Sequence, residues 1–96
     1  MSGPESKIKD LVKRRFEKEF PDAYRFCPVQ NGMGAPGLDV FYCIPCGIFV
    51  AIETKAPGKK PTSGQLREHE RMRGMGQRVE VIDSFEGVDR LLGEMR

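Results

Sequence analysis

The spacing of apolar residues near the start of the chain predicts an amphipathic helix between Ser2 and Pro21. Its apolar positions recur every three or four residues: Ile8, Leu11, Val12, Phe16 and Phe20. Ser2 and Glu5 have the spacing of a capping box, which predicts that the helix begins beside Ser2. Pro21 would end the helix, because proline lacks a backbone N–H and does not fit a helix interior.

Two apolar runs of strand length follow, at residues 38–43 and 48–55. Residues 44–47 between them form a turn, and residues 31–37 (NGMGAPG) form a loop dense in glycine and proline. The two runs therefore predict a hairpin of antiparallel strands.

The last third of the chain is predicted to form a helix, a strand and a helix. Thr62 and Gln65 make a second capping box at the start of a helix that ends near Gly74. Residues 78–83 form a short strand, and Ser84 is placed to cap the final helix. The apolar stripe of that helix comprises Phe85, Val88, Leu91, Leu92 and Met95.

The predicted order is α-β-β-α-β-α in a chain of 96 residues, which suits one domain over residues 1–96. A helical connection between the second and third strands predicts a right-handed parallel crossover. The fold class is therefore a small α/β core with a mixed sheet flanked by helices. A formal net charge of +2 permits a nucleic-acid partner without requiring one.

The cysteine count and the hydropathy pattern bear on where the protein acts. Three cysteines are few, and odd in number, for a disulfide scaffold. The polar start of the chain does not read as a signal peptide, and no apolar run reaches transmembrane length. We therefore expect a protein of the reducing cytoplasm with no membrane partner.

Charged residues interrupt the hairpin at Asp39, Glu53 and Lys55. Because side chains alternate along a strand, Glu53 and Lys55 share one face. If Cys43 pairs with Phe49, Asp39 falls opposite Glu53, with the two β-carbons about 4.5–5.5 Å apart. Two opposed carboxylates repel each other unless a cation lies between them.

The acid pair therefore predicts a site for a divalent cation. Mg²⁺ prefers oxygen ligands and commonly takes one or two carboxylates together with a substrate phosphate. Lys55, on the same face, would orient or deprotonate a water, or stabilise charge on a phosphate. These residues around a metal predict phosphodiester hydrolysis. A solvated strand face is the simpler alternative, and the position of the charges at the end of an apolar run disfavours it.

The motif formed by Asp39 and residues 53–55 (ETK) resembles the signature of the PD-(D/E)xK nuclease superfamily. The GAPGLD stretch that ends at Asp39, the Pro-Gly turn after Lys55, and Gln65 in the next helix resemble one family in particular. That family is the virus-type replication-repair nuclease domain, VRR-NUC. The resemblance covers most of the chain, and it departs at Leu38, where the family usually has proline.

The resemblance implies a restriction-endonuclease-like core that cleaves structured DNA (branched, flapped or junction DNA), as in DNA repair. Asp39 and Glu53 would hold Mg²⁺ or Mn²⁺, with the backbone carbonyl of Thr54 as a further ligand. Lys55 would position the attacking water, and Gln65 would point from its helix into the site. The family also implies a homodimer, an origin in phages and hence the host cytoplasm, and no small-molecule cofactor.

Two of these site residues have a purely structural alternative. Many family members use a glutamate of the first helix, and Glu5 is the best positional match, but it also fits the capping box with Ser2. Gln65 likewise fits the capping box with Thr62. The two roles are compatible, because a cap holds the side chain near the start of the helix.

Two surfaces suggest where partners bind. Lys59 and Lys60 follow the site directly and are expected to contact DNA phosphates, with a solvated loop as the alternative. The final helix, residues 85–95, is a candidate dimer surface because of its apolar stripe.

Three other functions fit part of the sequence. A Holliday-junction resolvase of the same superfamily would share the α-β-β order and cut four-way junctions symmetrically. A non-catalytic DNA-binding module is disfavoured because both acids and the lysine are present. A zinc or redox centre would use Cys43 and Cys46, joined for zinc by Cys27 and His69. However, no second close pair of ligands is present, and the C-x-x-C motif precedes a strand instead of a helix.

Overall fold

The computed structural model describes residues 3–28 and 38–95. The elements are α1 (Pro4–Glu19), β1 (Tyr24–Phe26), β2 (Val40–Ile44), β3 (Ile48–Thr54), α2 (Ser63–Gly74), β4 (Arg78–Ile82) and α3 (Phe85–Met95). The four strands form one mixed sheet in the order β1-β2-β3-β4. The predicted α/β class is confirmed with one additional strand, while the predicted loop at residues 31–37 lies outside the described residues.

The first helix starts differently from its predicted capping box. Its N-cap residue is Gly3, Pro4 is the first helical residue, and no side chain caps the helix. Proline suits this position, because an N–H there would have no partner within the helix. The predicted cap is therefore wrong, although Ser2 itself lies outside the described residues. Glu5 pairs instead with Lys9, with 3.4 Å between Oε2 and Nζ.

The pattern of apolar residues does not predict strand β1. This strand has only three residues, all of them exposed, so it lacks the alternation that marks a half-buried strand. It pairs antiparallel with β2, and Phe26 lies opposite Phe41. Strand β1 therefore forms only through its pairing with β2, which is a tertiary contact.

The β2–β3 hairpin has the predicted register, in which Cys43 pairs with Phe49. The antiparallel ladder begins at Val40, the first residue of β2. Continued by one residue, this register places Asp39 opposite Glu53. The pairing on which the predicted site depends is therefore present.

The connections around α2 and α3 follow the sequence signals. Helix α2 joins β3 to β4, and these two strands run parallel, as the crossover predicts. The capping box of Thr62 and Gln65 is formed at the start of α2. The hydroxyl of Ser84 accepts a hydrogen bond from the backbone N–H of Gly87 at the start of α3.

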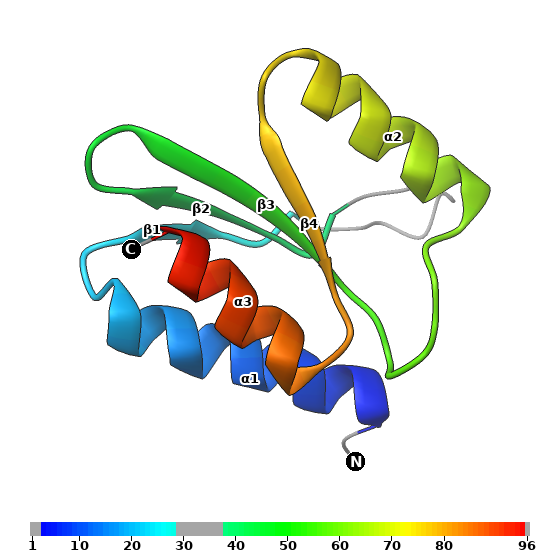
Figure 1. The fold of residues 1–96 in the computed structure, drawn as a ribbon, viewed down its shortest axis with the longest axis horizontal. Helices are drawn as coiled ribbons and strands as arrows, with labels where there is room; N and C mark the ends of the chain where they lie inside the picture. The colour runs from blue at the N-terminus through cyan, green and yellow to red at the C-terminus, as the bar shows by residue number, and fades with distance from the viewer. Residues whose placement is uncertain (1–2, 29–37, 96) are drawn as a thin grey trace.

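Helices cover both faces of the sheet (Figure 1): α1 and α3 lie on one face and α2 on the other. The larger core, between the sheet and the α1–α3 layer, includes Val12, Phe16, Tyr42, Val50, Ile52, Val88 and Leu92. The smaller core, under α2, comprises Leu38, Ala51 and Val79 with Phe41, Phe49 and Met72 packed against it. The end of β3 therefore lies between two helical layers.

The apolar stripe of α3 is used inside the molecule. Its Val88, Leu91, Leu92 and Met95 are buried in the larger core. Packing on the sheet and α1 covers these four side chains, whereas Phe85 of the same stripe is 52% exposed. Of the expected dimer surface on this helix only Phe85 is accessible, and its role in a dimer stays a prediction. None of the described helices is long and apolar enough to cross a membrane.

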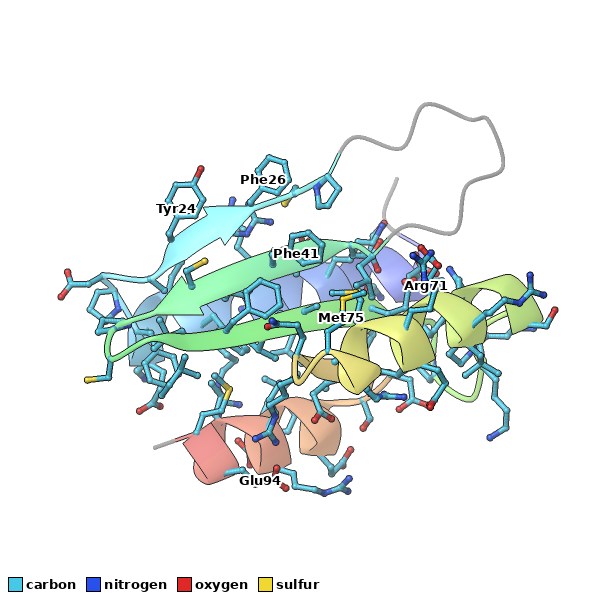
Figure 2. The ribbon with its side chains drawn as sticks, turned by 90° about the horizontal axis from the view of Figure 1, so that it is seen from above. Tyr24, Phe26, Phe41, Arg71, Met75 and Glu94 are labelled. Atoms are coloured by element: carbon cyan, nitrogen blue, oxygen red, sulfur yellow. The ribbon has the colours of Figure 1, made fainter. Side chains whose placement is uncertain are left out.

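An aromatic surface remains open on the edge strand. Tyr24 is 66% exposed and Phe26 is 49% exposed. Both project from the same side of the sheet as Phe41 (Figure 2), and the rings of Phe26 and Phe41 stack with centroids 6.2 Å apart. Helix α2 lies on this face, but it leaves these two side chains of β1 exposed.

Candidate active site

A cavity of about 490 Å³ lies where the start of α1, the ends of β2 and β3, and the start of α2 meet. All five residues predicted to be catalytic line it: Glu5, Asp39, Glu53, Lys55 and Gln65. These residues come from four separate segments of the chain. The fold thus brings all five side chains to one cavity. The spacing of residues in the sequence predicts this proximity only for the three that belong to the hairpin.

Asp39 lies immediately before β2 and is held by the end of β3. Its backbone N–H donates to the carbonyl of Ile52 at 3.2 Å. Its Oδ2 accepts hydrogen bonds from both the backbone N–H and the hydroxyl of Thr54, each at 2.7 Å. Charge-assisted bonds of this kind are stronger than neutral ones, so they fix the carboxylate firmly.

The alternation of side chains along β2 ends at Asp39. Leu38 packs against Ala51 under α2, whereas Asp39 Oδ1 lies 3.6 Å from Nζ of Lys9 on α1. Asp39 thus reaches toward the α1 side, and Glu53 points toward α2. The two carboxylates meet at the end of the sheet, instead of lying side by side on one face as strict alternation predicts.

Glu53 is 3% exposed near the end of β3. Its Oε2 accepts a hydrogen bond from Gln65 Nε2 at 3.2 Å and lies 3.9 Å from Nζ of Lys55. Burial and the Asp39 carboxylate raise the pKa of Glu53 to about 7, against the opposing effect of Lys55. The nearby amine therefore does not fully compensate the charge of the acid pair, which favours the binding of a cation.

Gln65 acts in the helix cap and in the site at once. Its side-chain Oε1 accepts a hydrogen bond from the backbone N–H of Thr62 at 2.9 Å, and its backbone N–H donates to the Thr62 hydroxyl at 3.2 Å. Its Nε2 remains free to donate to Glu53. The cap therefore aims the amide at the carboxylate, so the two predicted roles coexist.

Lys9 is a site residue that the sequence interpretation missed. Its Nζ lies within ion-pair distance of both Glu5 and Asp39. Partial burial acts to lower the pKa of Lys9, but the Asp39 and Glu5 carboxylates outweigh it and raise the pKa. Its spacing of four residues from Glu5 is the one sequence signal that indicates this pairing.

His69 is a second residue near the site. It is 1% exposed, and its Nε2 lies 3.9 Å from Oε1 of Glu53. Within the described residues, neither ring nitrogen of His69 nor Oε1 of Glu53 has a hydrogen-bond partner. Burial, aided by Arg73 and Lys55, lowers the pKa of His69, so its ring is neutral at neutral pH. In the sequence, the signal that could place His69 near the site is its position one helical turn after Gln65.

The remaining predicted contacts lie at the edge of this arrangement. Lys59 and Lys60 are exposed in the loop between β3 and α2, and neither lines the cavity. Their contact with DNA phosphates stays a prediction. The role of the Thr54 backbone carbonyl as a metal ligand also stays a prediction, although the residue lies between Glu53 and Lys55 at the cavity.

The oxygen atoms at the cavity fit a hard divalent cation. Asp39 and Glu53 supply two carboxylates, and the ammonium group of Lys9 already lies where a positive charge is stabilised by Asp39 and Glu5. Residues 3–28 and 38–95 contain no group of three or more His, Cys, Asp or Glu side chains arranged to hold a metal. Mg²⁺ does not need such a group, because it keeps several waters and takes one or two carboxylates.

Within the described residues, the cysteines and His69 are not gathered into the alternative zinc site. Cys27, Cys43 and Cys46 are free and exposed. His69 is buried beside Glu53 and is not turned toward a cysteine, and no three-ligand cluster forms in the part of the chain that the structure describes. Cys46 lies in the hairpin turn before β3, with a φ of 77°, and so does not begin a helix.

Comparisons with known proteins show the family to which the chain belongs. A solved structure described as a "VRR_NUC domain" matches with a TM-score of 0.83 and 33% sequence identity, over 99% of this chain and 100% of that one. This chain belongs to the VRR-NUC family. The "Putative nuclease p44" of Acyrthosiphon pisum secondary endosymbiont phage 1 is 46% identical over 63 residues. That match spans 65% of this chain and 63% of the phage protein's length. No family model matches the chain.

The departure from the usual VRR-NUC pattern at Leu38 has a structural explanation. Leu38 is 5% exposed and packs with Ala51 and Val79 in the core under α2. Asp39 is positioned separately, through Ile52 and Thr54. Leucine therefore fills this position without disturbing the first acid of the site.

Proposed function

We propose that this protein is a metal-dependent DNA endonuclease of the PD-(D/E)xK type. The observation that carries the proposal is the acid pair of Asp39 and Glu53, which lines one cavity with Lys55. Burial and Asp39 raise the pKa of Glu53 to about 7, so the two carboxylates ionise together less readily than usual, and a bound cation would favour the charged form of Glu53. Membership of the VRR-NUC family and the name of the phage relative support the same class of reaction.

Each site residue has a proposed part in the hydrolysis. Asp39, Glu53 and the backbone carbonyl of Thr54 would hold Mg²⁺ or Mn²⁺. When bound, the ion would lower the pKa of a coordinated water and neutralise charge on the scissile phosphate. Lys55, whose side chain is 15% exposed, positions the attacking water and faces the charge that develops on the phosphate. Glu5 extends the acid cluster from α1.

The charges around the cavity favour an anionic polymer as the substrate. Lys9, Lys13 and Arg25 line the cavity beside the acids, and Lys59 and Lys60 are exposed on the adjacent loop. We propose that these cations contact the phosphates of structured DNA, which is binding without sequence specificity. Water then cleaves the phosphodiester to a phosphomonoester and a free hydroxyl.

We also propose that the protein acts as a homodimer, in the host cytoplasm if its source is a phage. Because the apolar stripe of α3 is buried except for Phe85, the exposed aromatic residues Tyr24 and Phe26 of β1 are the better dimer surface. Light scattering after size exclusion is expected to give a dimer mass for the parent and a monomer mass for Phe26→Ser. A monomeric parent would contradict the dimer without affecting the proposed chemistry.

A cleavage assay tests the proposed activity. End-labelled duplex, flap, splayed-arm and four-way-junction DNA would be incubated with Mg²⁺ or Mn²⁺, beside Asp39→Asn as a size-matched control. We expect metal-dependent cutting of one DNA structure, and loss of cutting in the variant. Symmetric cutting of the four-way junction alone would identify a resolvase. Tight binding without cutting in either metal would overturn the nuclease and indicate a DNA-binding module.

A further inference from the structure

We infer that His69 is a positioning residue for Glu53. When a cation is bound at the site, its Nε2–H would donate to Oε1, the carboxylate oxygen on the side away from the cavity, and so hold Oε2 toward the cation. The inference rests on the proposed function, because it concerns the orientation of a proposed metal ligand.

The two carboxylate oxygens of Glu53 have different neighbours. Oε2 contacts Gln65 and Lys55, and both of these residues line the cavity. Oε1 faces His69, which is absent from the cavity lining and is buried between α2 and the sheet. One oxygen is thus presented to the site, and the other is directed at a buried imidazole.

One unpartnered atom of His69, Nε2, lies near an unpartnered oxygen of Glu53, Oε1. Buried polar groups are nearly always hydrogen-bonded, yet Oε1 of Glu53 and both ring nitrogens of His69 have no partner within the described residues. The 3.9 Å between Nε2 and Oε1 is about 1 Å longer than an ordinary hydrogen bond. Hydrogen bonds at catalytic sites are often long without ligand and shorten when it binds. An ionised carboxylate only accepts hydrogen bonds, so the N–H of His69 is its matching donor.

A packing role for His69 predicts something different from a positioning role. Glutamine places an amide nitrogen near the position of Nε2, whereas asparagine places one near Nδ1. If His69 acts as a donor to Oε1, His69→Gln should replace it and His69→Asn should not. If the ring only fills space, glutamine should still be tolerated better, because it is closer to histidine in size, but the loss of Mn²⁺ affinity in each variant should then follow its loss of stability in EDTA.

The test measures Mn²⁺ affinity by calorimetry for the parent, His69→Gln and His69→Asn, with thermal unfolding in EDTA to confirm that each folds. We expect His69→Asn to weaken Mn²⁺ binding by about 10- to 100-fold, as is typical when the partner of a ligand is lost. His69→Gln should stay within a few-fold of the parent. Equal affinities in the two variants, equal losses, or losses that only follow the loss of stability in EDTA would overturn the inference. If the parent binds Mn²⁺ in these cases, the proposed function still stands. A parent that binds no Mn²⁺ would overturn both.

A second measurement uses the unmodified protein and does not depend on the variants folding. His69 is the only histidine in the chain, so its ring ¹⁵N signals are unambiguous. We expect the proton on Nε2, with a shift of the Nε2–H signal when Mg²⁺ is added. A ring protonated only on Nδ1 would overturn the inference.

Discussion

The Asp39 carboxylate accepts two hydrogen bonds from the single residue Thr54, whose N–H and hydroxyl both lie 2.7 Å from Oδ2. Because Thr54 directly follows Glu53 in β3, this contact holds the first acid of the site beside the second. Asp39 lies just outside the β2–β3 ladder, so the strand pairing alone does not fix its side chain. The contact with Thr54 is thus a specific requirement of the proposed metal site.

Thr54→Val removes the hydroxyl donor while keeping the backbone N–H and the side-chain shape. Because a hydrogen bond to a charged group contributes roughly 1.5–3 kcal/mol, we expect the free energy of unfolding in EDTA to fall by about 2 kcal/mol. Urea denaturation measures this change. In an Asp39→Ala background the same substitution should cost much less, and an equal cost in both backgrounds would show that the bond is unimportant.

The raised pKa of Glu53 predicts how the stability of the metal-free protein depends on pH. The folded protein holds the Glu53 proton up to about pH 7, whereas the unfolded chain releases it near pH 4.5. The folded state therefore binds more protons between these values, and stability falls as the pH rises through them. Glu53→Gln cannot lose a proton, so it should be more stable than the parent at pH 8 by about 1–3 kcal/mol after solvent screening.

Thermal unfolding of the parent and Glu53→Gln in EDTA at pH 5 and pH 8 tests this expectation. The lowered pKa of His69 gives the opposite slope below pH 6.5, but it acts in both proteins and largely cancels in the difference. Mn²⁺ at pH 8 should stabilise the parent and not the variant. A Glu53→Gln protein with the same advantage at pH 5 as at pH 8 would contradict the assignment.

Lys9 lies against two carboxylates of the site and is expected to compete with a metal ion. Its side chain is 47% exposed, so its ion pairs are weak. We expect Lys9→Met to tighten Mn²⁺ binding by about two- to fivefold, measured by calorimetry. Lys7→Met, on the same helix but not lining the cavity, is the control for the lost charge. Weaker binding in Lys9→Met would show that the amine supports the site.

Substitutions at Thr62 and Gln65 distinguish the contribution of the helix cap from the contribution of Gln65 to the site. Thr62→Ala and Gln65→Ala each break the capping box and should each cost about 1 kcal/mol of stability. Only Gln65→Ala removes the donor to Glu53, so only this variant should also weaken Mn²⁺ binding and lower kcat/KM. If Thr62→Ala lowers cleavage as much, Gln65 acts through the cap alone.

Local signals in the sequence predicted the elements that local interactions define. The capping box at Thr62, the cap at Ser84 and the hairpin register each depend on residues close in the chain. The predicted start of α1 was wrong by one residue, because the N-cap is Gly3 instead of Ser2. Pro4 then occupies the first helical position, which suits proline. Strand β1 has no pattern of its own and exists only through pairing with β2.

The candidate site was predictable only in part for the same reason. Asp39, Glu53 and Lys55 share one hairpin, so the register brings their backbone positions close together. Lys9 and His69 come from helices on opposite faces of the sheet, and their contacts arise when those helices pack on it. The turn of the Asp39 side chain toward α1 also depends on packing, because Leu38 takes the place under α2.

Single-turnover cleavage by Lys55→Met, with Mn²⁺ affinity measured on the same sample, tests the proposed mechanism most directly. Methionine keeps most of the length of the lysine side chain and removes only its amine, so the acid pair should still bind the ion. We predict a rate at least about 100-fold below the parent, within the range for loss of a catalytic proton-transfer or charge-stabilising group, with Mn²⁺ affinity nearly unchanged. Cleavage at the parent rate would contradict the account.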